Sequence, residues 1–146
     1  MTSPTQKLLA EGLGTAVLIV AVIGSGIMAQ TLTQDIALVL LANTIATGAT
    51  LLVLITIFEP LSGAHFNPAV TLVMVLRGHF GWQLALAYVG AQIIGGALGV
   101  LIAHSMFELP LLQFSTHIRT GSAQWFAESV ASFGLVLTIF GALHAR

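Results

Sequence analysis

The sequence predicts an all-α integral membrane protein with four transmembrane helices and one short helix that enters the membrane without crossing it. Of its 146 residues, 57% are hydrophobic and 6% are charged, whereas soluble domains have roughly 45–50% apolar and about 25% charged residues. Four apolar stretches have the length of about 20 residues that crosses a hydrocarbon core. A polar, turn-forming stretch beginning near Gly63 interrupts this apolar chain.

Charge and cysteine content exclude several classes of function. Four basic and five acidic residues give a net charge of -1 and leave no basic face for nucleic acid. The chain has no cysteine, so it has neither disulfides nor thiolate metal sites. The first apolar stretch is about twenty residues long and lacks a small-residue cleavage site, so we interpret it as a span rather than a signal peptide. We expect no cofactor and no metal.

The first span is predicted at residues 8–28, after a polar tail at residues 1–6. Its one charged residue is Glu11, and a charge at a helix centre costs about 2.5–3.5 kcal/mol on insertion scales. Either Glu11 lies near the interface, one turn from Lys7, and stays hydrated, or it has a hydrogen-bonding partner inside the protein.

The second span is predicted at residues 36–58. Small and hydroxyl side chains, Thr47 among them, interrupt its apolar sequence and are typical of close helix packing in membranes. Pro60 follows shortly and is expected to stop the helix.

Asn67 and Pro68 predict the start of a short helix, since Asn caps free backbone donors and Pro fits the first turn. Arg77 ends its apolar part. Residues 68–76 would therefore extend only about 15 Å, half of a core about 30 Å thick. Non-helical backbone at that depth, here residues 63–66, is tolerated only when it is buried in protein or lines a wet cavity. This pattern indicates a pore or a binding site.

The third span is predicted at residues 82–105, with Trp82 and Tyr88 near one interface. Glycines and alanines form a face for tight helix crossing, and we expect Gln92 within it to bond a neighbouring helix or the stretch before Asn67. Residues 106–121 are predicted to be an extramembrane loop.

The fourth span is predicted at residues 122–143, again with one acid, Glu128. The basic residues predict the orientation in the membrane. Lys7, Arg77 and Arg146 fall on one side of the membrane and Arg119 on the other, so the positive-inside rule places both ends of the chain in the cytoplasm.

The fourth span repeats the first at an offset of 117 residues. Ala10 and Glu11 align with Ala127 and Glu128, and Gly24 aligns with Gly141. Because the fourth span runs in the opposite direction to the first, the two are related as in an inverted repeat.

The stretch Ser62-Gly63-Ala64-His65-Phe66-Asn67-Pro68-Ala69-Val70-Thr71 resembles the first signature loop of the major intrinsic proteins, the family of aquaporins and glycerol channels. The resemblance implies an aquaporin-like inverted-repeat bundle, with the signature loop and half-helix at residues 62–77. A second Asn-Pro-Ala, 117 residues after Asn67, would fall beyond Arg146. The resemblance thus covers roughly 60% of a family member, and we expect the chain to be truncated.

The resemblance also implies roles for individual residues. Thr47 falls at the second-helix position of the outer constriction, usually a large aromatic residue, and would leave a wider, more polar gate. Glu11 would accept hydrogen bonds from the backbone before Asn67. Gln92 and Glu128, like Glu11, are expected to support the loops. The residues expected to line the pore are Gly63, Ala64, His65, Phe66, Asn67, Pro68, Ala69 and Thr47.

The expected function is a passive channel for water or small neutral solutes such as glycerol, urea and metalloid hydroxides, arsenite included. The family implies a homo-oligomer, a tetramer, in the plasma (inner) membrane with a cytoplasmic N-terminus. The alternative is a non-conducting fragment that needs a complementary half or is a truncated gene product. An enzyme is not expected, since the sequence has no His-Glu-x-x-His spacing.

Overall fold

The computed structural model describes residues 2–113, 118 and 120–144. The helices in chain order are α1 (Pro4–Leu32), α2 (Ile36–Ser62), α3 (Pro68–Leu76), α4 (Trp82–Met106) and α5 (Ser122–His144). All but α3 are long and apolar enough to cross a membrane. The predicted all-α membrane protein, with four spans and a half-helix that begins at Pro68, is confirmed.

The chain divides into two compact units, residues 1–112 and residues 113–146. Helices α1 to α4 form the first unit. Helix α5 belongs to the second, and none of its residues is buried. Arg119 and Arg146, on which the predicted orientation partly rests, lie outside the described residues, as do residues 114–117 of the predicted extramembrane loop.

Helix α1 begins earlier than the span predicted at residues 8–28. The Ser3 hydroxyl accepts from the Gln6 N–H at 3.3 Å, and the Gln6 side chain accepts from the Ser3 N–H at 2.8 Å. This is a capping box, with Pro4 at the first helical position. The helix thus starts at Pro4, within the polar residues 1–6 that precede the predicted span.

Helix α2 continues through Pro60, so the expectation that this proline stops the helix was wrong. Proline lacks an N–H and therefore removes one hydrogen bond, but the following residues still complete the turn. The end comes at Gly63, which has a left-handed backbone with φ of 91° and donates its N–H to the Glu59 carbonyl at 3.0 Å.

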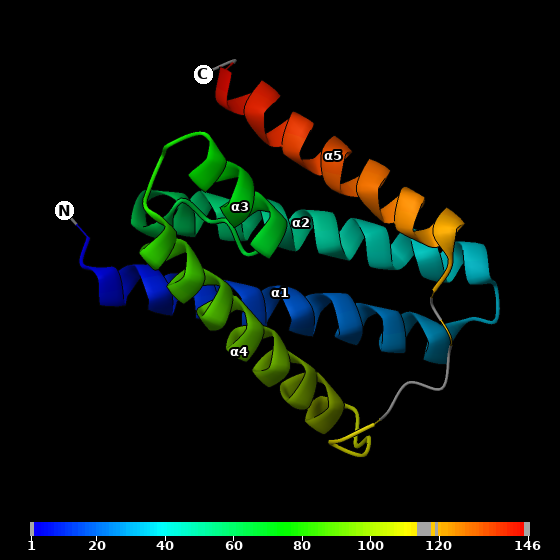
Figure 1. Ribbon diagram of the computed structural model, residues 1–146. Helices are drawn as coiled ribbons and strands as arrows, with labels where there is room; N and C mark the ends of the chain where they lie inside the picture. The colour runs from blue at the N-terminus through cyan, green and yellow to red at the C-terminus, as the bar shows by residue number, and fades with distance from the viewer. Residues whose placement is uncertain (1, 114–117, 119, 145–146) are drawn as a thin grey trace. The chain divides into compact units, whose positions relative to one another are not determined.

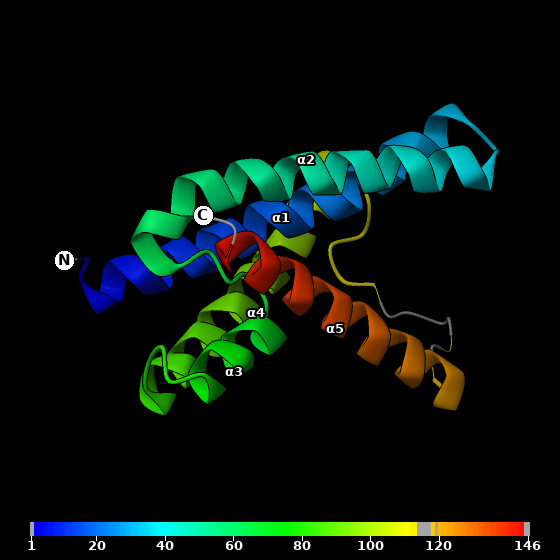
Figure 2. The same cartoon turned by 90° about the horizontal axis from the view of Figure 1, so that it is seen from above.

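Helix α1 packs against both α2 and α4. In Figures 1 and 2, α2 runs alongside α1 while α4 crosses it. The Asn43 amide of α2 donates to the Val22 carbonyl at 2.6 Å and to the Ser25 hydroxyl at 3.0 Å. On the other side, a Cβ added at Gly95 would overlap the Gly12 carbonyl oxygen and lie 2.9 Å from its carbon. The crossing of α1 and α4 is thus close enough to require glycine at position 95.

Gly95→Ala is expected to destabilise the first unit by about 1–3 kcal/mol, because the added methyl group meets backbone that cannot turn away. Gly90→Ala is the matched control on the same helix, since an added Cβ there meets no atom within 4 Å. Denaturant unfolding in detergent micelles, followed by tryptophan fluorescence, measures both. Equal stability of the two variants would contradict the close crossing.

Candidate functional site

The signature loop, residues 63–67 in the structure, joins the end of α2 to the start of α3. Besides Gly63, it holds two residues at positive φ, Ala64 at 50° and Phe66 at 48°. Such a backbone costs a residue with a Cβ about 1–3 kcal/mol and persists only when its surroundings fix it. The loop therefore depends on contacts with the helices around it.

Glu11 supplies the main contact. It is 0% exposed, so the alternative in which it stays hydrated at the interface was wrong. Its Oε1 accepts from the Ser62 hydroxyl at 2.6 Å and the His65 N–H at 3.0 Å. Its Oε2 accepts from the Phe66 N–H at 2.8 Å and from Nε2 of Gln92 at 2.9 Å. Each carboxylate oxygen thus has two donors, the number that its lone pairs accommodate.

A second buried chain of hydrogen bonds links α4, α3 and the loop. Nε2 of Gln92 also donates to the Thr71 hydroxyl at 3.0 Å, and Nδ1 of His65 lies 3.1 Å from the same oxygen. Thr71 is 0% exposed, and its hydroxyl hydrogen has no other acceptor among the described residues. We therefore assign Thr71 as the donor to Nδ1, which leaves the His65 hydrogen on Nε2.

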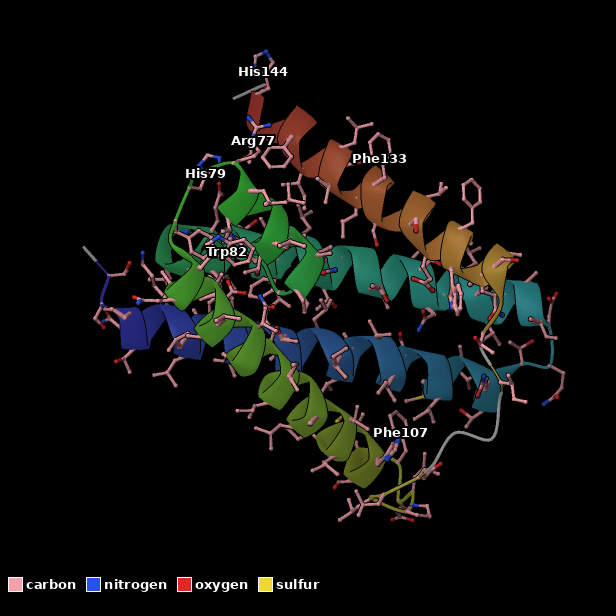
Figure 3. All side chains as sticks on the ribbon, viewed as in Figure 1. Arg77, His79, Trp82, Phe107, Phe133 and His144 are labelled. Carbon is pink, nitrogen blue, oxygen red and sulfur yellow. The ribbon has the colours of Figure 1, made fainter. Side chains whose placement is uncertain are left out.

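Aromatic side chains hold the loop against α4. The Tyr88 hydroxyl donates to the Ser62 carbonyl at 2.8 Å. The rings of His65, Phe80 and Tyr88 lie with every pair of centroids 5.3 Å apart. Tyr88 is 2% exposed, so its ring is enclosed by protein. Trp82, at the start of the same helix, is 56% exposed and is labelled in Figure 3 together with Arg77 and His79 of the turn after α3.

Asn67 caps α3, since its Oδ1 accepts from the Ala69 N–H at 2.8 Å. Its Nδ2 has no hydrogen-bond partner in the described part of the chain and is therefore available to a ligand. The carbonyls of residues 63–66 likewise accept no hydrogen bond from any described residue. The N–H groups of His65 and Phe66 both donate to Glu11. These two donors of the loop are therefore hydrogen-bonded, whereas its carbonyl acceptors are unpaired.

A recess of about 260 Å³ opens beside the loop. Its lining combines the ends of α1, α2 and α4 and includes Lys7, Glu59, His65, His79, Phe80 and Tyr88. No group of three or more potential metal-ligating side chains occurs within residues 2–113, 118 and 120–144. Charged, imidazole and aromatic side chains thus all face this recess.

The remaining residues singled out in the sequence make no hydrogen bond to Glu11 within the described part of the chain. Thr47 of α2 is partly exposed, and its Oγ1 is buried without a hydrogen-bond partner among the described residues. Glu128 is exposed on α5, in the second unit. Gly63 and Pro68 are exposed, whereas Ala64 and Ala69 are half-buried.

Sequence reasoning gave no role in holding the loop to Ser62, Thr71 or Tyr88. A signal for Tyr88 was present: it precedes Gln92 by four residues, and residues four apart share a face of a helix. The face of α4 that carries Gln92 therefore also carries the tyrosine.

Comparison with known proteins agrees with this geometry. The family model described as major intrinsic protein matches residues 1–146. The chain belongs to this family. It is 57% identical over 140 residues to the aquaglyceroporin AqpS of Rhizobium meliloti, an alignment that covers 96% of this chain and 60% of that protein.

Two further relatives of this major intrinsic protein are more distant. The probable aquaporin NIP4-2 of Arabidopsis thaliana is 34% identical, over 94% of this chain and 48% of its own. The glycerol uptake facilitator protein of Streptococcus pneumoniae is 32% identical, over 92% of this chain and 63% of its own. The chain thus spans about half to two thirds of the length of these relatives, and it is a multi-pass membrane protein.

Glu11→Gln is expected to release the signature loop. A glutamine side chain replaces one acceptor oxygen by an NH₂ group, which would face two of the four existing donors, and each buried donor left unpaired costs about 1–3 kcal/mol. Hydrogen exchange of the His65 and Phe66 amides in detergent or nanodiscs measures the loss. Glu108→Gln, which removes the same charge from an exposed turn, is the control and should leave these amides protected. Unchanged protection in Glu11→Gln would contradict the assigned role.

Proposed function

We propose that this chain forms part of a passive, non-enzymatic channel for water and small neutral solutes, glycerol among them. The observation that carries the proposal is a half-helix capped by Asn67 and preceded by a row of unpaired carbonyls. Relatives named as an aquaglyceroporin and a glycerol uptake facilitator support it. The chain aligns with 60% of AqpS, so channel activity of a full-length protein is proposed for this chain.

The loop backbone would conduct by replacing the hydration of the solute. A molecule entering a narrow pore loses hydrogen bonds to water, and the carbonyls of residues 63–66 would accept hydrogen bonds from its hydroxyl or amide groups in turn. Nδ2 of Asn67 would donate to its oxygen atoms. Small neutral molecules that carry both donors and acceptors therefore fit best.

Cations would be excluded by the start of α3. The N-terminus of a helix carries the equivalent of roughly half a positive charge. The carboxylate oxygens of Glu11 are directed at Ser62, the loop N–H groups and Gln92, so they are not presented to a cation at Asn67. The site therefore favours neutral solutes over cations.

The finer selectivity is proposed from Thr47. A threonine at this position in place of an aromatic residue would leave space for solutes larger than water, which include glycerol, urea and metalloid hydroxides such as arsenite. We further propose that Glu128 supports a second loop as Glu11 supports the first, and that the complete channel is a tetramer in the plasma membrane with a cytoplasmic N-terminus.

A second candidate is a unit that conducts only together with a complementary half. The observation that favours it is that the chain covers 60% of AqpS and 48% of NIP4-2. An acid such as Glu128 on α5 also needs a partner within a membrane.

Stopped-flow swelling of proteoliposomes tests both candidates, with water, glycerol and urea as permeants. If the chain conducts, flux should exceed that of empty vesicles, and Asn67→Asp should remove the excess. Aspartate caps a helix as well as asparagine does, so the variant replaces the amide donors by a negative charge without removing the cap.

The control is Gln34→Glu, the same amide-to-acid change at an exposed position in the turn between α1 and α2, and it should conduct like the unmodified chain. Flux equal to bare lipid in the unmodified chain would contradict conduction by this chain alone and favour the second candidate.

A further inference from the structure

We propose that Gly14 is a positioning residue for the channel, because its missing side chain leaves the space in which the Phe66 ring lies. The inference deepens the proposed function and rests on it for its consequence in solute flux. Its structural part stands on the contact between α1 and the loop.

The space at Gly14 is fully taken by the Phe66 ring. A Cβ added at Gly14 would overlap Cε1 of Phe66 and lie 2.6 Å from Cζ and 2.8 Å from Cδ1. Real Cβ atoms essentially never approach so closely, so any larger residue at this position must displace the ring. Phe66 is 5% exposed, and its ring stands at 87° to that of Phe58, with centroids 5.8 Å apart. The ring therefore sits between α1 and α2.

Phe66 is held at two points of the same helix. Its N–H donates to Glu11 at 2.8 Å, and its ring lies on Gly14, three residues later. Residues three apart share one face of a helix, so both contacts come from the same side. Together they hold Phe66 at its left-handed φ of 48°. Loss of the ring contact would therefore also loosen the hydrogen bond to Glu11.

Displacement of the Phe66 ring would also move the groups that are proposed to contact solute. Phe66 directly precedes Asn67, and its own carbonyl is the last of the unpaired row. A larger residue at position 14 would push the ring away from α1 and shift this carbonyl and the Asn67 amide with it. The size of the residue at position 14 thus sets the position of both groups.

Hydrogen exchange of the amides of residues 62–67 tests the structural part in four variants of the full chain: Gly14→Ala, Phe66→Leu, the double variant and Gly12→Ala. In Gly14→Ala, exchange at His65 and Phe66 should rise by about tenfold or more through local opening. Leucine lacks the Cε1 and Cζ atoms and its δ carbons can turn aside, so the double variant should regain the protection of Phe66→Leu alone. Gly12→Ala adds the same methyl group to α1 in ordinary contact, 3.4 Å from the Ala91 carbonyl oxygen, and should change nothing.

Three results would overturn the proposal: unchanged protection in Gly14→Ala, protection lost equally along α1 and α4, or a double variant no better protected than Gly14→Ala. Proteoliposome flux is measured in parallel, where the glycerol-to-water ratio should change in Gly14→Ala and recover toward that of Phe66→Leu in the double variant. If the unmodified chain carries no flux, the proposed function fails while the exchange data still decide the role of Gly14.

Discussion

The negative charge of Glu11 has to be satisfied inside the protein, and the arrangement of the first unit follows from that constraint. A buried carboxylate is stable only when hydrogen bonds replace the water that it has lost. Here the donors come from three places, the end of α2, the loop and α4. One charged group on α1 therefore ties together elements that are up to 81 residues apart in the sequence. Removal of a single donor leaves the charge less well paired, so the four contacts depend on one another.

The same carboxylate explains why the N–H groups of the loop are hydrogen-bonded while its carbonyls are not. The N–H groups of His65 and Phe66 are drawn to α1, and the positive φ values at Ala64 and Phe66 are the backbone strain that accompanies this arrangement. The carbonyls are left without partners among the described residues. A strained backbone is commonly found where function requires it. In this protein the strain keeps acceptors available at the start of α3, whose capping residue has a free amide donor.

The parts of the fold that sequence predicted are those that local chemistry determines. Asn67 followed by Pro68 specified the start of α3, and the lengths of the apolar stretches specified the spans. Gln92 was recognised as a buried polar group that needs a partner. The capping box at Ser3 was also local and could have been found, since Ser-x-x-Gln is a known pattern.

Other features depend on contacts between distant segments and have no local pattern. The last residue of α2, beyond Pro60, is held by distant segments, since the Ser62 hydroxyl donates to Glu11 and its carbonyl accepts from Tyr88. The fit of the Phe66 ring against Gly14 joins residues that only the packing of α1 on the loop brings together. Sequence likewise could not show that the Thr71 hydroxyl lies between Gln92 and His65. Thr47 Oγ1 has no hydrogen-bond partner among the described residues and Glu128 belongs to the second unit, so their roles stay proposals.

The Glu11 carboxylate holds both backbone N–H groups of the loop, and a direct distance measurement in lipid bilayers tests this arrangement. Solid-state NMR would measure the dipolar couplings between the ¹³C-labelled carboxyl carbon of Glu11 and the ¹⁵N-labelled backbone nitrogens of His65 and Phe66. Resolved couplings to both nitrogens at once are expected for two simultaneous hydrogen bonds. A coupling to only one nitrogen, or to neither, would contradict this arrangement.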